Sequence, residues 1–254
     1  MNERYAVRAA VAPMLGEPRV GSEQLSQRVA GHMVSVLEER GRWLRVRGED
    51  EYEGWMHSGY LEPVTPELTA RSEGRRVSLG CVVCEADGRR RALPLGAVVA
   101  GDAAVERGEA LLPNEARTRF PRDGRAIART ASELFEGAPY LWGGVTPWGA
   151  DCSGLVQTTF ALHGVQMPRD AWQQARTGDA VGPDIGALHP GDLLFFSSRP
   201  DRHITHVAVS RGGHHIVHVA VDLGGYGTQR LDDPCDAGAQ ALLERFVLAR
   251  RPRL

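Results

Sequence analysis

Cys152 is the residue of this sequence best placed to act as a nucleophile. It lies in the segment Ala150-Asp-Cys-Ser-Gly154, where a predicted helix over about residues 152–163 begins. The backbone N–H groups and the positive dipole end at a helix start favour a thiolate over a thiol. A glycine-rich loop precedes the segment and allows close approach of a substrate backbone. A lone cysteine at a helix start is usually a packing residue, so the assignment depends on a nearby base.

Two histidines supply candidate bases for this thiol. His206 and His218 each lie in an apolar segment that predicts a strand, Thr205-His-Val-Ala-Val209 and Ile216-Val-His-Val-Ala220. A thiol nucleophile needs one imidazole to take and return a proton and a further group to orient that imidazole. A three-residue loop, with one glycine in the left-handed conformation, would place the two rings opposite each other. A two-residue turn at Gly212-Gly213 would send His218 to the other face.

The alternative interpretation of this histidine pair is a half-exposed cross-strand pair without a role. The remaining cysteines predict no further chemistry. Cys81-Val-Val-Cys84 is a single pair, whereas a structural zinc site needs four ligands. We interpret these two as small buried strand residues, with a redox or metal role as the alternative. No cofactor and no metal are expected.

The elements that must position these residues fall in the last part of the chain. Asp123 can cap a helix over residues 124–136, and the helix near 152–163 follows a loop rich in glycine and tryptophan. Strands are predicted at 193–196, 206–209, 215–220 and 246–249. Helices followed by an antiparallel sheet indicate an α+β domain.

The first part of the chain has a different texture. Residues 5–65 are short alternating segments separated by turn residues, which is typical of a small all-β barrel. Residues 67–118 repeat the pattern more weakly, with strands near 77–83, 90–93 and 97–100, and predict a second, degenerate barrel. We therefore predict three domains, at residues 1–66, 67–120 and 121–254.

Bulk composition argues against several classes of function. The formal net charge is -2, from Lys+Arg 30 and Asp+Glu 32, which favours neither nucleic acid nor an acidic membrane surface. No segment approaches the roughly 20 apolar residues of a membrane-spanning helix. Because the first residues contain no uninterrupted apolar run of the kind found in signal peptides, we expect a cytoplasmic protein.

Six motifs occur in order in the second part of the sequence: Tyr140-Leu-Trp-Gly-Gly144, Asp151-Cys-Ser-Gly154, Pro168-Arg-Asp170, His189-Pro-Gly-Asp-Leu-Leu-Phe-Phe196, Thr205-His-Val-Ala-Val209 and His218. Together they resemble the signature of the NlpC/P60 cysteine peptidases. They cover roughly residues 123–250. The upstream stretch, with Gly41-Arg-Trp-Leu-Arg-Val46 and Tyr52-Glu-Gly-Trp-Met56, is similar to bacterial SH3 domains. The resemblance implies one or more small SH3-like barrels followed by a papain-like α+β domain.

The resemblance also implies roles for the matching residues. Cys152 would be the nucleophile, His206 the base and then the acid, and His218 the group that orients His206. Tyr140 matches an active-site tyrosine whose hydroxyl reaches the cysteine or the developing oxyanion. Relatives often carry Ser where this chain has Ala171, so any hydrogen bond from that position is missing.

SH3-like modules before such a domain are similar to γ-D-glutamyl-L-diamino acid endopeptidases, which recycle cell-wall peptides. These recognise a free N-terminal L-Ala, and the resemblance suggests that Asp151 binds its amine and Ser153 hydrogen-bonds the substrate. Asp151 is equally suited to cap the helix, and the two roles are compatible.

The expected partner is therefore a small stem peptide of the cell wall. Preference for diaminopimelate or lysine is left open. Glu51, Tyr52 and Glu53 are candidates to complete the pocket, but the sequence does not choose among them and favours their interpretation as solvated turn residues. The alternatives are a secreted peptidoglycan hydrolase of the same fold and a non-catalytic binding protein for cell-wall peptides.

Overall fold

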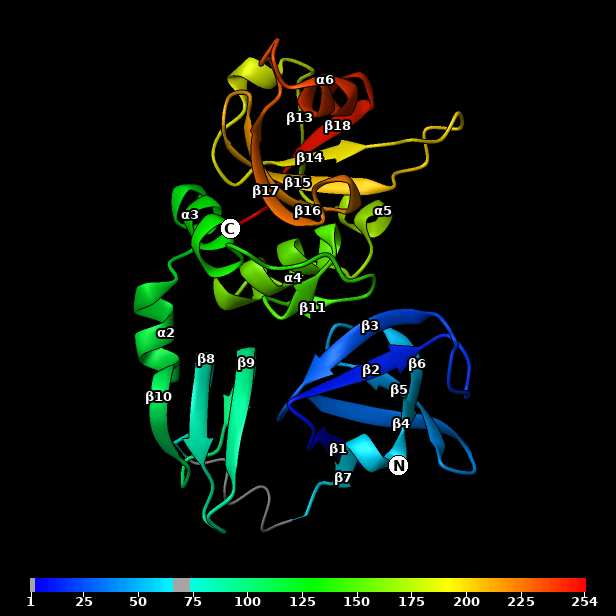
Figure 1. Ribbon diagram of the computed structural model, residues 1–254, viewed down its shortest axis with the longest axis vertical. Coiled ribbons are helices and arrows are strands. Elements are labelled where there is room, and N and C mark those ends of the chain that lie inside the picture. Colours follow the sequence, from blue (N-terminus) through cyan, green and yellow to red (C-terminus); the bar gives the residue numbers. More distant parts are fainter. Residues whose placement is uncertain (1–2, 66–73) are drawn as a thin grey trace. The chain divides into compact units, whose positions relative to one another are not determined.

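The computed structural model describes residues 3–65 and 74–254, and the chain divides into two compact units, residues 1–119 and 120–254 (Figure 1). The first unit is built from strands and the second from helices and a sheet. Within the described residues, no helix combines the length and the apolar character needed to cross a bilayer.

A coiled seven-stranded sheet forms the beginning of the first unit. Alternation along the strands fills its interior: Leu44 and Val46 are buried, whereas Arg45 and Arg47 between and after them are exposed. This pattern confirms the predicted SH3-like barrel. In the sheet order β3-β2-β6-β5-β4-β1-β7, the strands are β1 (Arg4–Val7), β2 (Val11–Leu15), β3 (Gln24–Val29), β4 (Met33–Arg40), β5 (Trp43–Gly48), β6 (Glu53–His57) and β7 (Leu61–Pro63).

A three-stranded sheet follows, with β8 (Arg76–Cys84), β9 (Arg90–Val99) and β10 (Ala104–Leu111) in the order β10-β8-β9, and then helix α2 (Pro113–Arg119). The sequence predicted separate strands at 90–93 and 97–100, but the structure has the single strand β9. Pro94 does not end it because β9 is an outer strand, where proline is tolerated. The two outer strands do not pair with each other among the described residues, so this sheet is open where a second barrel was predicted.

This open sheet buries its apolar face partly against the seven-stranded sheet. Val29 and Ala30 join one buried cluster with Cys81 and other residues of β8 and β9. The N–H of Val98 donates to the carbonyl of Ala30 over 2.8 Å. This shared buried cluster accounts for residues 1–119 forming one compact unit. The domain boundary predicted between residues 66 and 67 lies outside the described residues and stays a prediction.

The second unit has a six-stranded sheet of order β13-β18-β14-β15-β16-β17. Its strands are β13 (Asp179–Val181), β14 (Leu193–Phe196), β15 (His206–Gly212), β16 (His215–Ala220), β17 (Gly225–Arg230) and β18 (Phe246–Arg251), and a short hairpin joins β11 (Val145–Thr146) to β12 (Gly149–Ala150). Its helices are α3 (Gly124–Leu134), α4 (Cys152–Leu162), α5 (Ala171–Gln174) and α6 (Ala237–Glu244), and its short 3-10 turns are η2 (Ile185–Ala187) and η3 (Val221–Leu223).

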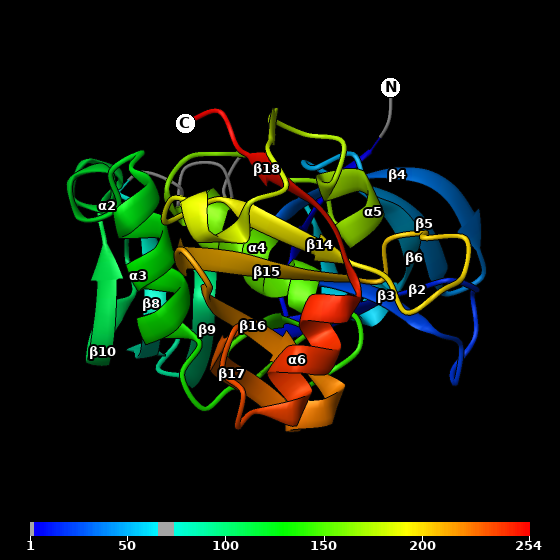
Figure 2. The same ribbon diagram turned by 90° about the horizontal axis from the view of Figure 1, so that it is seen from above.

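Helices cover both faces of this sheet. Helices α3 and α4 pack against β15 and β16, and α6 lies against the other face (Figures 1 and 2). Asp123 caps α3 by accepting the N–H of Ala126, as predicted. The predicted bounds of β14 and β16 are confirmed, whereas β13, β17, α5 and α6 were not predicted.

Candidate active site

Cys152 is the first residue of α4, and Asp151 is its N-cap. The carboxylate of Asp151 accepts the N–H of Gly154 over 2.7 Å, which confirms the predicted capping role. Gly154 lies against the backbone of the loop before the helix, so that an added Cβ would meet the carbonyl oxygen of Gly144. The glycines therefore allow the loop to close tightly over the helix start.

The sulfur of Cys152 is held beside the first residues of β15. Burial, followed by the negative charge of Asp151, raises the pKa of Cys152 to about 12. Hydrogen bonds from the N–H groups of Val207 and Ser153 and the positive charge of Arg169 act in the opposite direction. This raised pKa runs against the predicted thiolate, because burial disfavours the charged form of the sulfur. The side chain is a neutral thiol that must lose its proton during reaction.

His206 and His218 lie side by side, with His206 Nε2 2.8 Å from His218 Nδ1. The rings meet edge to face, with their centroids 5.0 Å apart. They share one face, as the predicted site required, but they are not directly opposite each other. The strand register pairs Val209 with Val217 and Ser210 with Ile216, which makes the two histidines diagonal neighbours.

The reason for this register is a bulge combined with a two-residue turn. The pairing shifts between Ser210 and Gly212, which leaves Arg211 as the extra residue, and the turn consists of Gly213 and His214. Gly213 has a φ of 55°, as expected for a glycine in the left-handed region. A two-residue turn alone would have placed the rings on opposite faces, and the bulged residue restores the common face.

Both imidazoles are neutral in this environment. Burial and the neighbouring ring of His218 lower the pKa of His206 to about 3. Burial likewise lowers the pKa of His218 to about 4, against the opposing effect of a hydrogen bond to Gln229. A neutral imidazole carries one ring proton and one basic nitrogen. The His218 ring occupies the Nε2 side of His206. The Nδ1 atom of His206 is therefore the nitrogen left to serve as a base.

Tyr140 is fastened near the nucleophile by its backbone. Its N–H donates to the carbonyl of Gly224, and the residue forms an isolated bridge with Ala150. Burial, followed by the neighbouring acidic groups of Cys152 and Asp151, raises the pKa of Tyr140 to about 12. The phenol therefore keeps its proton near neutral pH and is available as a hydrogen-bond donor.

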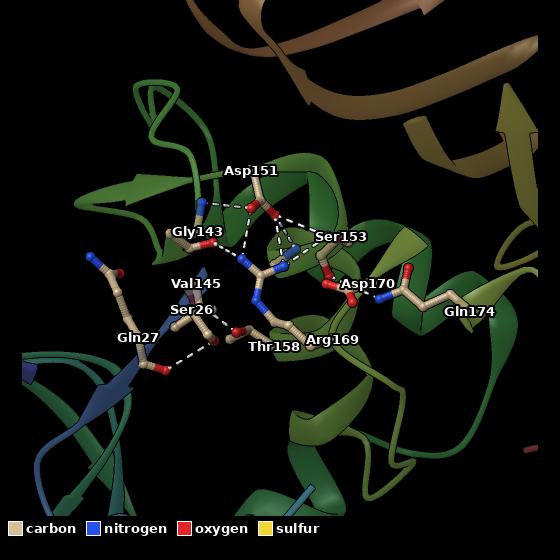
Figure 3. Close-up of polar contacts among 12 residues, drawn as sticks. Ser26, Gln27, Gly143, Val145, Asp151, Ser153, Thr158, Arg169, Asp170 and Gln174 are labelled. Atoms are coloured by element: carbon tan, nitrogen blue, oxygen red, sulfur yellow. Dashed lines mark hydrogen bonds and ion pairs between the residues drawn. The ribbon is translucent and has the colours of Figure 1, made fainter. Parts of the chain in front are cut away.

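Asp151 and Ser153 belong to a buried network centred on Arg169 (Figure 3). The guanidinium donates to Asp151 Oδ1 over 3.0 Å and to Asp151 Oδ2 over 2.6 Å, and also to Ser153 Oγ over 2.7 Å. Ser153 Oγ donates in turn to Asp151 Oδ1. The N–H of Gly143 donates to Asp151 Oδ2 over 2.9 Å. Both oxygens of Asp151 are thus already used within the protein.

This network bears on the predicted contacts with substrate. The structure places Asp151 and Ser153 on either side of the nucleophile, but only 7% and 6% of their surfaces are exposed. Binding of an amine by Asp151 stays a prediction, and it would require the amine to share the carboxylate with Arg169. The sequence assigned no role to Arg169, although the motif Pro168-Arg-Asp170 was noted. The available signal was the pairing rule that a buried carboxylate, such as the one expected at Asp151, is usually partnered by an arginine.

Cys81 and Cys84 belong to the first unit, residues 1–119. Cys81 is buried in β8, where its sulfur is 3.3 Å from Ser78 Oγ, and Cys84 is half-buried. Both are free thiols. In the described ranges 3–65 and 74–254, no group of three or more His, Cys, Asp or Glu side chains is arranged to hold a metal ion.

Comparison with known proteins agrees with this geometry. Residues 137–235, which include Cys152, His206 and His218, match the NlpC/P60 family, and residues 13–62 match the bacterial SH3 domain. The chain carries an NlpC/P60 peptidase domain after a bacterial SH3 domain. The NlpC/P60 match ends at residue 235, before α6 and β18.

Two relatives from Bacillus match about three quarters of the chain. The chain is 29% identical over 208 residues to a gamma-D-glutamyl-L-lysine dipeptidyl-peptidase of Bacillus subtilis, covering 74% of this chain and 69% of the relative. It is also 29% identical over 227 residues to a protein of that name from Bacillus cereus, covering 74% of this chain and 64% of the relative. The chain thus spans about two thirds of the length of these relatives.

A solved structure shares the fold over nearly the whole chain. The crystal structure of an NlpC/P60 family protein from Bacillus cereus aligns with a TM-score of 0.80 and 18% identity, covering 98% of this chain and 99% of that one. At this identity the likeness establishes the fold.

Proposed function

We propose that this protein is a cysteine peptidase that hydrolyses the γ-D-glutamyl–diamino acid bond of free cell-wall peptides with an N-terminal L-Ala. The observation that carries the proposal is the 2.8 Å contact of His206 Nε2 with His218 Nδ1, beside a cysteine that begins a helix. The names of the two Bacillus relatives support the choice of bond. Relatives of this kind and the NlpC/P60 match support the peptidase class.

In the proposed reaction, Cys152 and His206 start as a neutral pair. The sulfur attacks the γ-carbonyl of the D-glutamyl residue while the thiol proton moves to His206 Nδ1. The tetrahedral intermediate then expels the amine of the diamino acid, which takes that proton from His206. The thioester that remains on Cys152 is hydrolysed by water, with His206 again acting as the base. His218 orients His206 throughout and does not touch the substrate.

Two donors are proposed to stabilise the negative oxygen that forms during attack. The backbone N–H of Cys152 lies at the helix start, where it has no partner within the helix. The Tyr140 hydroxyl keeps its proton because its pKa is raised to about 12. The backbone donor is held in place by the helix start before the substrate binds, so it needs no reorganisation as the charge develops.

Recognition of the free amino end would restrict the enzyme to peptides already released from the wall. Asp151 and Ser153 are our candidates for this recognition, and Arg169 would hold the carboxylate in place while the amine approaches. We further propose that the protein acts in the cytoplasm, where released peptides are recycled. A secreted hydrolase of the same fold and a binding protein without activity are the competing proposals.

A comparison of free and blocked peptides tests the proposal. The purified protein should release the diamino acid from L-Ala-γ-D-Glu-diaminopimelate or from the lysine analogue, and acetylation of the L-Ala amine should abolish release. Equal cleavage of the acetylated peptide, or solubilisation of intact sacculi, would favour the secreted hydrolase. Binding of the peptide without release by the wild-type protein would favour the binding protein.

A further inference from the structure

A chain of hydrogen bonds continues outward from His218. His218 Nε2 lies 3.0 Å from Gln229 Oε1 on β17, and Gln229 Nε2 donates to Asp236 Oδ2 over 2.9 Å. Asp236 is the N-cap of α6, where its other oxygen, Oδ1, accepts the N–H of Ala239 over 2.9 Å. These hydrogen bonds therefore link His206, through His218 and Gln229, to Asp236 at the start of α6.

The ionisation state of Asp236 determines which group donates and which accepts in each hydrogen bond of this series. Hydrogen bonds from Ala239 and Gln229 lower the pKa of Asp236, so it is a carboxylate and can only accept. The amide of Gln229 must then turn its NH2 group toward Asp236 and its oxygen toward His218. An amide oxygen can only accept, so His218 must carry its ring proton on Nε2.

The same logic extends to the base. With the proton on Nε2, His218 Nδ1 is a bare nitrogen and accepts from His206 Nε2–H. His206 then has no proton on Nδ1, which is the form needed to take a proton from Cys152. The opposite arrangement would put a hydrogen on His206 Nδ1 and remove the base.

We propose that Gln229 and Asp236 are positioning residues that hold His206 in the tautomer with a bare Nδ1. The inference rests on the proposed function of His206 as the base toward Cys152. Neither residue touches the substrate, and both act through His218.

A purely structural role accounts for only part of these contacts. The Asp236 oxygen that caps α6 is Oδ1, whereas the oxygen that meets Gln229 is Oδ2. Strands β16 and β17 pair through their backbones along their whole length. The pairing of β17 therefore does not depend on the Gln229 side chain. The amide also transmits the polarity of Asp236 without placing a full charge against His218. The charged groups that act on the two rings are Asp236 on His218 and Arg245 on His206.

The substitution Asp236→Asn exchanges the donor and acceptor roles along these hydrogen bonds while it preserves the N-cap of α6. The asparagine oxygen still accepts the N–H of Ala239, because asparagine is as good an N-cap as aspartate. Its NH2 group now faces Gln229, which must turn its amide over and present NH2 to His218. His218 then carries its proton on Nδ1 and drives a proton onto His206 Nδ1.

The double variant Asp236→Asn/Gln229→Glu restores the wild-type donor and acceptor roles at His218 and has the same net charge as the wild type. A carboxylate at position 229 accepts from the asparagine and from His218 Nε2. We expect Asp236→Asn to lower kcat on L-Ala-γ-D-Glu-lysine by at least about tenfold with little change in KM. The double variant should recover most of that loss at pH 8. Asp123→Asn, which alters the cap of α3, is the matched control and should leave kcat unchanged.

Wild-type kcat in Asp236→Asn, no recovery in the double variant, or a fall in kcat matched by a fall in Tm would overturn the proposal. Nitrogen NMR of protein labelled at the histidine rings supplies a readout that does not need turnover. The wild type should show His206 protonated on Nε2, and Asp236→Asn should show it protonated on Nδ1. If the peptide is not cleaved but the tautomers change as expected, the proposed substrate fails and the positioning role stands. Unchanged tautomers would sink the positioning role, whatever the activity.

Discussion

Arg169 grips Asp151 with two hydrogen bonds, of 3.0 and 2.6 Å, at a point where the side chains are only 1% and 9% exposed. Because Asp151 also caps α4 and receives the N–H of Gly143, this ion pair joins the loop before the nucleophile to the helix that begins with it. The position of Cys152 therefore depends on an arginine that follows it by a considerable stretch of chain.

Removal of this arginine should destabilise the protein strongly. In Arg169→Met, Asp151 would keep its charge in a buried site without its partner, which costs about 3–5 kcal/mol. Urea unfolding followed by fluorescence measures the free energy of unfolding. Arg253→Met is the control, because its pair with Asp179 is 80% and 64% exposed and the substitution should leave stability unchanged. Similar losses in the two variants would contradict the importance of the buried pair.

The tight contact between loop and helix predicts that Gly154 cannot be replaced. In Gly154→Ala, the new methyl group would press on the carbonyl of Gly144, a backbone atom that cannot rotate away. Overpacking of this kind costs about 1–3 kcal/mol and should shift Cys152. Thermal unfolding and peptidase rates measure both effects. Gly182→Ala has nothing within 4 Å of its Cβ and should match the wild type, and a harmless Gly154→Ala would show that the loop is adaptable.

Tyr140 is expected to act on the rate rather than on substrate affinity. Tyr140→Phe removes one proposed oxyanion donor and should lower kcat by about a hundredfold with KM little changed. With a pKa of about 12, the hydroxyl keeps its proton at pH 9, so the pH profiles of the wild type and the variant should have the same shape below that pH. Steady-state kinetics from pH 6 to pH 9 provide the test. A change in KM alone would place the hydroxyl in substrate binding instead.

The buried histidine pair predicts how stability depends on pH. In the folded protein, the pKa values of His206 and His218 lie at about 3 and about 4, whereas an unfolded histidine titrates near ~6.5. As the pH falls from about 6.5 toward 4, the unfolded chain binds protons that the folded chain refuses, so stability falls. Each histidine should contribute up to about 1.4 kcal/mol per pH unit in this range.

Calorimetry of the wild type and of His206→Gln/His218→Asn at pH 7.5 and pH 5 checks this expectation. The double variant should lose less stability between the two pH values than the wild type. His215→Asn, at an exposed position of the same hairpin, should behave like the wild type. Parallel pH dependence in the wild type and the double variant would mean that the two rings are not held neutral by burial.

Local patterns in the sequence predicted the parts of the fold that local physics determines. The Asp123 cap places the start of α3, and continuous apolar segments delimit β14 and β16. The sequence did not predict β17, because Gly225 and Gly227 interrupt the pattern of residues that favour a strand. With it, the sequence missed Gln229, whose relation to His218 exists only once β16 and β17 are paired.

The chemistry of the site was predicted less completely, because it depends on tertiary burial. The sequence identified Cys152, His206 and His218 and placed the two rings on one face. It did not foresee the bulge at Arg211 that makes the rings diagonal neighbours. It also did not foresee that burial raises the pKa of Cys152, since the desolvation of a thiol cannot be read from neighbouring residues.

The most direct test of the central claim is the detection of the covalent intermediate on Cys152. The wild-type protein is mixed with L-Ala-γ-D-Glu-lysine, quenched rapidly, digested and examined by mass spectrometry. We predict a transient L-Ala-γ-D-Glu acyl group on the peptide that contains Cys152, and background turnover by a folded Cys152→Ala variant. Release of lysine by Cys152→Ala, or an acyl group on Cys81, Cys84 or Cys235 instead, would contradict the assignment of Cys152 as the nucleophile.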